Sequence, residues 1–114
     1  MNRILEQSLL YDFYGELLTE HQKNIYEAVV LDDYSLSEVA QEHGISRQGV
    51  HDLVKRCDKT LSQYEAKLHL VERFLATKEL VAEIKKSAAA FRDTNDEDYL
   101  RKIEVVSDKI LDEM

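Results

Sequence analysis

The stretch from residue 46 to residue 59 combines polar and basic side chains of the types that contact nucleic acid. Arginine pairs with guanine and glutamine with adenine through two hydrogen bonds, so Arg47 and Gln48 are candidates for reading bases. Lysine and arginine elsewhere in the stretch suit the phosphate backbone, whose contacts position a protein on the duplex. The candidate nucleic-acid-binding residues are therefore Ser46, Arg47, Gln48, His51, Lys55, Arg56 and Lys59.

Each of these residues also has a structural interpretation that needs no ligand. Ser46 stands where a helix N-cap is expected, since its hydroxyl can accept a hydrogen bond from a first-turn amide. The first turn after it can simply be solvated, and His51 can be a neutral surface histidine. The lysines and Arg56 can be ordinary surface charges. At the level of sequence both interpretations stay open.

Residues 35–56 follow the pattern of a helix-turn-helix, which would position this stretch. Ser35 and Glu38 form a capping box that starts a first helix, and Gly44 can take the positive φ that ends it. Ala40 is small where the two helices would cross, and Ile45 is an apolar plug for the turn. The second helix would bury four residues at the spacing i, i+3, i+4, i+7, namely Val50, Leu53, Val54 and Cys57.

Helical geometry separates that apolar group from the polar one. At about 100° per residue from Arg47, the apolar residues fall at roughly 240–340° and the N-terminal polar residues at about 0–140°. Such a helix packs by one face and offers the other to a major groove. The alternative is an ordinary helical hairpin with a tight glycine turn. Gly49 lies beside the packed face and costs about 1 kcal/mol relative to alanine, which we interpret as room for another helix.

The rest of the chain predicts an all-α protein, because its 114 residues contain no proline and three glycines. Thr19 and Gln22 form a further capping box. From Arg47 to Phe91 a single helix would measure about 68 Å, so we expect a break near Ala76–Thr77. Thr94 is expected to cap the last helix. The predicted organisation is a helix-turn-helix domain over residues 1–75 and a helical extension over 76–114.

Apolar residues continue at heptad spacing after the predicted motif. They are Leu61, Tyr64, Leu68, Val71 and Leu75, followed by Leu80, Ile84, Ala88 and Phe91. Packing within the chain is one interpretation of this seam. The C-terminal half nevertheless carries more apolar surface than a small bundle needs, which predicts a homodimer through Leu61, Leu68, Val71, Leu75 and the C-terminal helices.

The net charge of −8 argues at first against a nucleic-acid ligand. The acidic excess lies outside the motif, however. Residues 1–34 hold two basic and seven acidic side chains, residues 35–73 hold six of each, and residues 74–114 hold seven basic and ten acidic ones. Nucleic-acid binding by the motif would therefore be confined to a small surface. It would be sensitive to salt and dependent on a second subunit or a protein partner.

Other classes of site are not supported by the residue pattern. His21, His43 and His69 lack ligand spacing for zinc with one another and with Cys57, and Cys57 is expected to be a buried apolar filler. Residues 93–104 imitate a calcium loop, but Asp98 stands where glycine is needed. No nucleophile–histidine–acid set or phosphate-binding loop is present, so we expect no cofactor, no metal and no catalysis. No apolar run could span a membrane, and the single cysteine suits the cytoplasm.

Two resemblances extend this interpretation. Residues 34–40 and 45–50 resemble region 4 of sigma-70-type factors. Together with Asp12-Phe13-Tyr14, Leu31-Asp32-Asp33-Tyr34-Ser35-Leu36 and Glu65-Ala66-Lys67-Leu68-His69-Leu70, the chain more closely resembles the YlxM-like family of small helix-turn-helix proteins over residues 5–75. Gly49 and Leu53 depart from that family's pattern.

The resemblance implies a bacterial, cytoplasmic, non-catalytic protein linked to the signal recognition particle pathway. The function expected first is a regulatory or accessory protein that binds nucleic acid, DNA rather than RNA. The alternative is a protein-interaction adaptor of the same pathway, with no direct nucleic-acid binding. Its partners would be components of the signal recognition particle.

Overall fold

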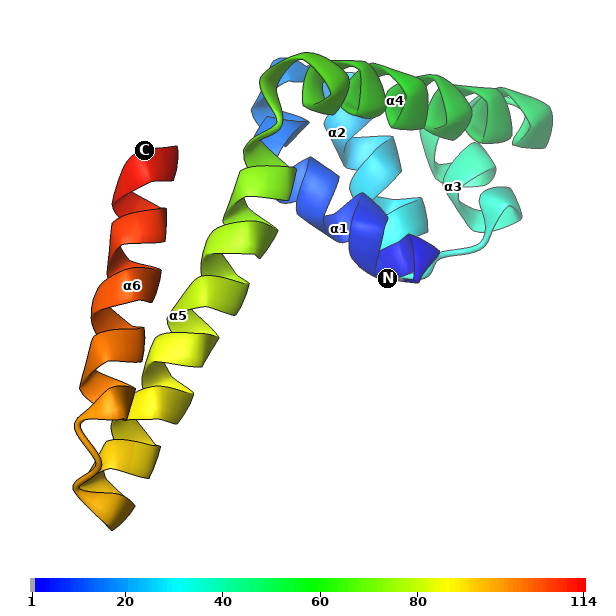
Figure 1. Ribbon diagram of the computed structural model, residues 1–114. Helices are drawn as coiled ribbons and strands as arrows, with labels where there is room; N and C mark the ends of the chain where they lie inside the picture. The colour runs from blue at the N-terminus through cyan, green and yellow to red at the C-terminus, as the bar shows by residue number, and fades with distance from the viewer. Residues whose placement is uncertain (1) are drawn as a thin grey trace. The chain divides into compact units, whose positions relative to one another are not determined.

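A computed structural model describes residues 2–114, in which all regular secondary structure is helical (Figure 1). The all-α prediction is confirmed. The elements in order are α1 (Arg3–Tyr14), the 3₁₀ turn η1 (Gly15–Leu17), α2 (Glu20–Tyr26), the π-helical turn η2 (Glu27–Leu31), α3 (Leu36–His43), α4 (Arg47–Leu68), α5 (Leu70–Thr94) and α6 (Asp98–Glu113).

The chain forms two compact units, the first ending at Val71 and the second beginning at Glu72. The expected boundary after residue 75 lies four residues later than this division, inside α5. The first unit contains the helix-turn-helix, and the second is the hairpin of α5 and α6. No helix within residues 2–114 is long and apolar enough to cross a membrane.

Local capping signals start and stop the helices of the first unit as the sequence indicates. The hydroxyls of Thr19 and Ser35 accept hydrogen bonds from the third amide of α2 and of α3, and both capping boxes are complete. Gly44 ends α3 with φ 66°, in the left-handed region that glycine enters at no steric cost. The amides of Gly44 and Ile45 both donate to the carbonyl of Ala40, so the turn satisfies its own backbone.

Helix α4 is the centre of the first unit, because α1, α2 and α3 all pack against it (Figure 1). Ala40 is buried where α3 meets α4, as the helix-turn-helix pattern requires. The buried apolar residues of this core are Leu10, Tyr14, Leu18, Ile25, Tyr26, Val39, Ala40, Val50, Leu53, Cys57, Leu61 and Val71. The predicted packed face of α4 is confirmed, except that Val54 is only half-buried.

Gly15 permits a close contact at the end of α1. A Cβ atom there would lie 2.9 Å from the ring of Tyr11, which real structures do not tolerate. That ring in turn stacks on Tyr26 with centroids 5.4 Å apart, and its hydroxyl donates to Glu27 at 2.5 Å. The glycine therefore lets one tyrosine lie flat across the start of η1 and reach the second helix.

The long helical stretch breaks at His69, so the expectation of a break near Ala76–Thr77 is wrong. His69 has φ 56° and its amide donates to the carbonyl of Glu65 at 2.8 Å. The Glu65 carboxylate accepts from the amide of Val71 at 2.9 Å, and the Tyr14 hydroxyl accepts from the amide of Leu70 at 3.1 Å. These groups cap the first turn of α5, and one of them comes from a helix more than 50 residues earlier.

This break also corrects the predicted dimer seam. Leu61 is 0% exposed and Val71 7% exposed, because both belong to the core of the first unit. They are therefore not available to a second subunit. Leu68 is 47% exposed, but the left-handed residue after it interrupts the heptad register before Leu75.

In the second unit, α5 and α6 lie side by side and run antiparallel (Figure 1). Thr94 does not cap α6 as predicted. It is the last residue of α5, and its hydroxyl donates back to the carbonyl of Ala90 at 2.7 Å. Asn95 then takes φ 58°, and the Asp96 carboxylate accepts from the amide of Asp98, where α6 begins. The last helix therefore starts at Asp98.

Candidate nucleic-acid interface

The structure places the candidate residues along the first four turns of α4. Ser46 is the N-cap, and its hydroxyl accepts from the amide of Gly49 at 2.9 Å. Arg47 and Gln48 follow in the first turn and are exposed, while Val50 and Leu53 anchor the opposite face in the core. The N-terminal turns of α4 are thus held rigidly and carry their polar side chains outward.

A shallow depression joins the start of α3 to the start of α4. It has a volume of about 450 Å³ and is lined by Leu36, Arg47, Gln48 and His51. His51 is half-buried, and its Nδ1 atom is buried without a hydrogen-bond partner among the described residues. That nitrogen lies 3.7 Å from the nearest carboxylate oxygen of Asp52. The two base-reading candidates and His51 are therefore neighbours in space.

Asp52 is an acidic residue within this polar surface, and its carboxylate is hydrogen-bonded to the side chain of Gln48. The side-chain amide of Gln48 donates to Oδ1 of Asp52 at 2.9 Å, one helical turn away. To contact a base, directly or through a water, the Gln48 amide would have to give up its hydrogen bond to Asp52. The carboxylate also places a negative charge where phosphates would approach, which weakens binding.

Asp58, the other acid of this part of α4, is held by the body of the domain. Its carboxylate accepts from the hydroxyl of Tyr26 at 2.6 Å and from the side-chain amide of Gln7 at 3.0 and 3.1 Å. Arg3 lies 3.3 Å from its Oδ2 atom. A charge count along the sequence subtracts Asp58 from the positive charge of the nearby lysines. In the structure, the charge of Asp58 is instead balanced by Arg3. No local signal reveals this, because Gln7 and Arg3 lie more than 50 residues away.

The three remaining basic candidates do not all gather at the depression. Lys55 lines a neighbouring groove of about 270 Å³ with Arg3 and residues of η2. Arg56 and Lys59 are exposed further along α4. Nine residues separate Arg56 from Arg47, which places it about 180° away around the helix. The basic residues therefore follow the outer side of α4 rather than one narrow stripe.

Gly49 has no helix packed against it, which corrects the interpretation of its position. A Cβ atom there would meet only the Ser46 hydroxyl, at 3.0 Å. The glycine is the third residue of α4, three positions after the N-cap, and its amide already donates to that hydroxyl. Close approach of another helix therefore does not explain why glycine stands here.

Among the described residues, neither a metal site nor a reactive thiol is evident. Residues 2–114 hold no group of three or more histidine, cysteine or acidic side chains that could bind a metal ion. The fold does bring His21 and His43 together, with ring centroids 6.0 Å apart, although 22 positions separate them in the sequence. Cys57 is buried, and burial raises the pKa of its thiol to about 11, with the nearby Asp58 charge adding to the shift.

Comparison with known proteins agrees with this architecture. Residues 1–103 match the model of the UPF0122 family, described as "Putative helix-turn-helix protein, YlxM / p13 like". The chain belongs to this family. A UPF0122 protein of Thermoanaerobacter sp. (strain X514) is 42% identical over 107 residues, covering 93% of this chain and 92% of the relative.

Two further UPF0122 relatives show the same relationship. The protein of Shouchella clausii is 42% identical over 90 residues, 79% of this chain and 83% of its own. That of Lactococcus lactis subsp. cremoris (strain MG1363) is 47% identical over 77 residues, 68% of this chain and 69% of its own. The resemblance to YlxM-like proteins is thus confirmed, and UPF0122 membership supports the helix-turn-helix assignment.

Proposed function

We propose that this UPF0122 protein is a non-catalytic regulatory or accessory protein that binds nucleic acid, DNA rather than RNA, through the outer face of α4. The observation that carries the proposal is the exposed first turn of α4. Arg47 and Gln48 project there from a helix whose other face packs into the core through Val50, Leu53 and Cys57. A helix held in this way can enter a major groove with its N-terminal side chains against base edges.

The electrostatics of α4 support binding that is weak and strongly salt-dependent. Four basic residues lie on the exposed surface of its first four turns, namely Arg47, Lys55, Arg56 and Lys59. Because Asp58 is neutralised internally, Asp52 is the one acid among them. Neutralising about three phosphates with Lys55, Arg56 and Lys59 gives a slope of log K against log salt near −2.7 for one chain.

The test is the double substitution Arg47→Ala with Lys55→Ala. We expect binding to a DNA duplex about two helical turns long to weaken by more than tenfold, measured by fluorescence anisotropy between about 50 and 200 mM salt. The slope should fall by about 0.9, because the phosphate contact of Lys55 is lost, while the loss of Arg47 removes a base contact. The matched control is Lys85→Ala with Arg92→Ala, two basic residues of α5.

Unchanged affinity and slope in the α4 variant would show that this face does not bind nucleic acid. An RNA hairpin of similar size that binds more tightly than the duplex would overturn the preference for DNA. An equal loss in the α5 control would show that only net charge matters.

A homodimer is the second part of the proposal, and the surface of the second unit favours it. Val81 is 52% and Leu111 67% exposed, and Leu100 and Ala88 are exposed as well. A second copy covering these residues would also double the basic surface offered to a duplex. Sedimentation at micromolar concentration should give twice the 13.3 kDa of one chain, and Val81→Lys with Leu111→Lys should return the single-chain mass.

The alternative function, an adaptor of the signal recognition particle pathway, rests on the resemblance to YlxM-like proteins and places the chain in the cytoplasm. Under this alternative α4 has no nucleic-acid role. Gel filtration with the purified GTPase of the particle, with and without its RNA, distinguishes the two. Co-elution that persists without RNA and in the Arg47→Ala, Lys55→Ala variant favours the adaptor.

A further inference from the structure

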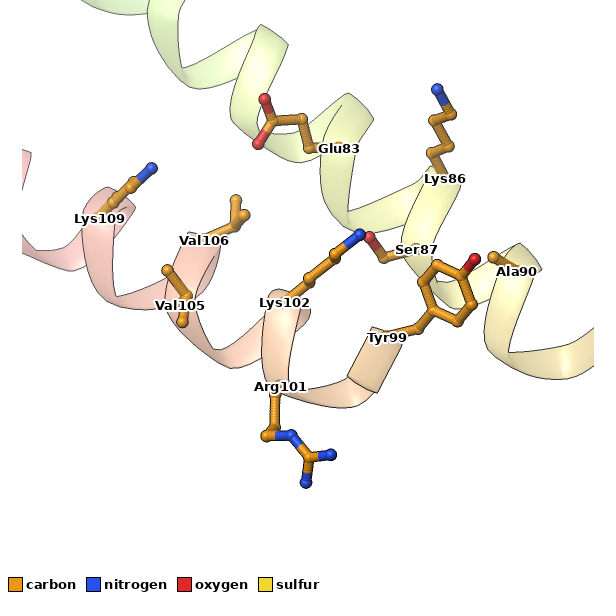
Figure 2. Close-up of a pocket in the computed structure, with 10 residues that line it drawn as sticks. All are labelled: Glu83, Lys86, Ser87, Ala90, Tyr99, Arg101, Lys102, Val105, Val106 and Lys109. Atoms are coloured by element: carbon orange, nitrogen blue, oxygen red, sulfur yellow. The ribbon is translucent and has the colours of Figure 1, made fainter. Parts of the chain in front are cut away.

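The second unit contains a groove between α5 and α6 that the proposed nucleic-acid function does not use (Figure 2). Its volume is about 560 Å³, and it is open along one side of the hairpin. The floor is apolar, with Ala90 from α5 and Tyr99, Val105 and Val106 from α6. Val105 is 55% exposed, so this floor is incompletely covered by the chain itself.

Lysines line the two rims of the groove. Lys86 lies on the α5 side, and Lys102 and Lys109 lie on the α6 side. Lys102 reaches from α6 toward Ser87 of α5, with its ammonium over the ring of Tyr99, 5.2 Å from the centroid (Figure 2). Lysine stems add apolar surface to a rim while their charges stay in water. The groove therefore combines an apolar floor with basic edges.

The other charged residues of the groove leave this positive character intact. Arg101 points away from α5 and forms an ion pair with Asp98 (Figure 2). Glu83 is the single acid among the lining residues. Three lysines against one glutamate make the groove positive, although residues 74–114 as a whole carry more acidic than basic side chains.

A second copy of the chain does not fit this groove. A symmetric pair has the same patch on both subunits. The centre of the floor lies between Val105 and Val106. A two-fold axis through this point would place each residue of α6 opposite the residue of the second copy that is equally far from the centre on the other side. Lys102 of one copy would then meet Lys109 of the other, and like charges facing each other are destabilising. The exposed residues proposed for the dimer do not line this groove.

A phosphate backbone also fits it poorly. Phosphate is favoured by arginine forks and by backbone amides that converge on one point. The one arginine of the groove is paired with Asp98, and the floor consists of aliphatic and aromatic side chains. Covering such a floor with phosphate would leave its apolar surface in contact with water or ions.

We propose that this groove binds an amphipathic helix of a partner protein whose apolar stripe is flanked by acidic side chains. The apolar stripe would cover Val105, Val106 and Ala90, as in other helix-in-groove complexes. Lys102 and Lys109 are seven residues apart, about 10.5 Å along α6. Acidic residues seven positions apart on the partner helix would match them, and an acid on its other side would meet Lys86. The inference concerns a second surface and is independent of nucleic-acid binding by α4.

The test uses the full-length chain and two synthetic helical peptides of about five turns. One carries leucines at i, i+3, i+4 and i+7 with glutamates on both flanks, and the other replaces every glutamate by lysine. The glutamate peptide is expected to shift the backbone amide resonances of residues 83–90 and 99–109 saturably. The lysine peptide should not.

A charge reversal then tests the rims. Lys102→Glu with Lys109→Glu should weaken binding of the glutamate peptide by more than about tenfold and create binding of the lysine peptide. The control Lys85→Glu with Arg92→Glu makes the same change in net charge at α5 residues outside the groove. It should alter the affinity by less than about twofold. Circular dichroism checks folding, and Lys102→Gln with Lys109→Gln replaces the reversal if it unfolds the hairpin.

Four results would overturn the proposal. The first is equal binding of both peptides, which would show only hydrophobic adsorption, and the second is the absence of saturable binding. The third is a DNA duplex that shifts the same amides at lower concentration than the glutamate peptide, which would make the groove a nucleic-acid site. The fourth is the same shifts on concentrating the chain alone, which would make the occupant a second copy.

Discussion

The hydroxyl of Tyr26 in α2 donates a hydrogen bond of 2.6 Å to Oδ1 of Asp58 in α4. Tyr26 is completely buried, and burial together with this bond raises the pKa of its hydroxyl far above the usual range. The pair joins the core to the candidate recognition helix and removes one acidic charge from its outer surface. It links the stability of the domain to the electrostatics of α4.

Replacing this hydroxyl should destabilise the first unit without removing its packing. For Tyr26→Phe we expect the free energy of unfolding to fall by about 1–2 kcal/mol, because Asp58 keeps Gln7 and Arg3 but loses its shortest bond. Urea unfolding measures the change. Tyr34→Phe, at an exposed tyrosine, should change it by less than about 0.5 kcal/mol. Equal effects of both substitutions would contradict the role of the Tyr26–Asp58 bond.

The start of α5 depends on a hydroxyl of α1. In Tyr14→Phe the amide of Leu70 loses its acceptor, whereas the Glu65 carboxylate loses the Tyr14 donor but still accepts from the amide of Val71. We therefore expect hydrogen exchange at Leu70 to accelerate more than at Val71, measured by NMR. Similar acceleration at both amides would indicate global destabilisation rather than loss of this cap.

Asp52 should limit the affinity of α4 for nucleic acid. Asp52→Asn removes one negative charge and lets Gln48 exchange its partner more easily, since a neutral acceptor holds an amide less strongly. Duplex affinity should rise several-fold at low salt, and the gain should shrink as salt increases. Fluorescence anisotropy measures both. Asp108→Asn, on α6, is the control, and an equal gain there would mean that overall charge alone is responsible.

The buried thiol of Cys57 should make the free energy of unfolding fall at alkaline pH. Cys57 has a pKa of about 11 in the folded chain, against about 9 for an ordinary thiol. Between these values the unfolded chain releases a proton that the folded chain keeps, so the free energy of unfolding falls as pH rises. Tyr14 and Tyr26, whose hydroxyl pKa values are also raised by burial, act in the same direction at higher pH.

Urea unfolding at pH values of about 8 and 10 measures this loss. Cys57→Ala should be less stable at both values but should lose less stability between them. A chromogenic thiol reagent at about pH 8 should react with the wild-type chain only after unfolding. Rapid reaction of the folded chain would show that the thiol is accessible.

Gly49 offers a stabilising substitution. Gly49→Ala should raise the free energy of unfolding by about 0.5–1 kcal/mol, because alanine has the higher helix propensity. The single close neighbour is the hydroxyl of Ser46, an exposed side chain that can shift by a few tenths of an ångström. Thermal unfolding checks this, with Gly44→Ala as the opposite case. Its positive φ makes alanine strained, so that variant should lose stability.

Capping residues were the most predictive part of the sequence, because their hydrogen bonds stay within one turn. Thr19, Ser35, Gly44 and Ser46 all act as expected. Thr94 did not, since it is the last residue of α5: its hydroxyl donates to the carbonyl of Ala90 and accepts from the amide of Asp96, which precedes α6. The break at His69 was missed for a different reason. Part of its support comes from Tyr14, and no local pattern indicates a partner so far away.

The sequence by itself determined the helical class, the helix-turn-helix and the polar face of its second helix, because all three follow from spacing and caps within a few turns. Only the tertiary structure decided which charges of that face act outward. It holds Asp58 against α1 and α2 and buries Leu61 in the first unit. The physical reason is that hydrogen bonds and burial between segments about 30 to 50 residues apart depend on how the helices pack, which a linear charge count does not contain.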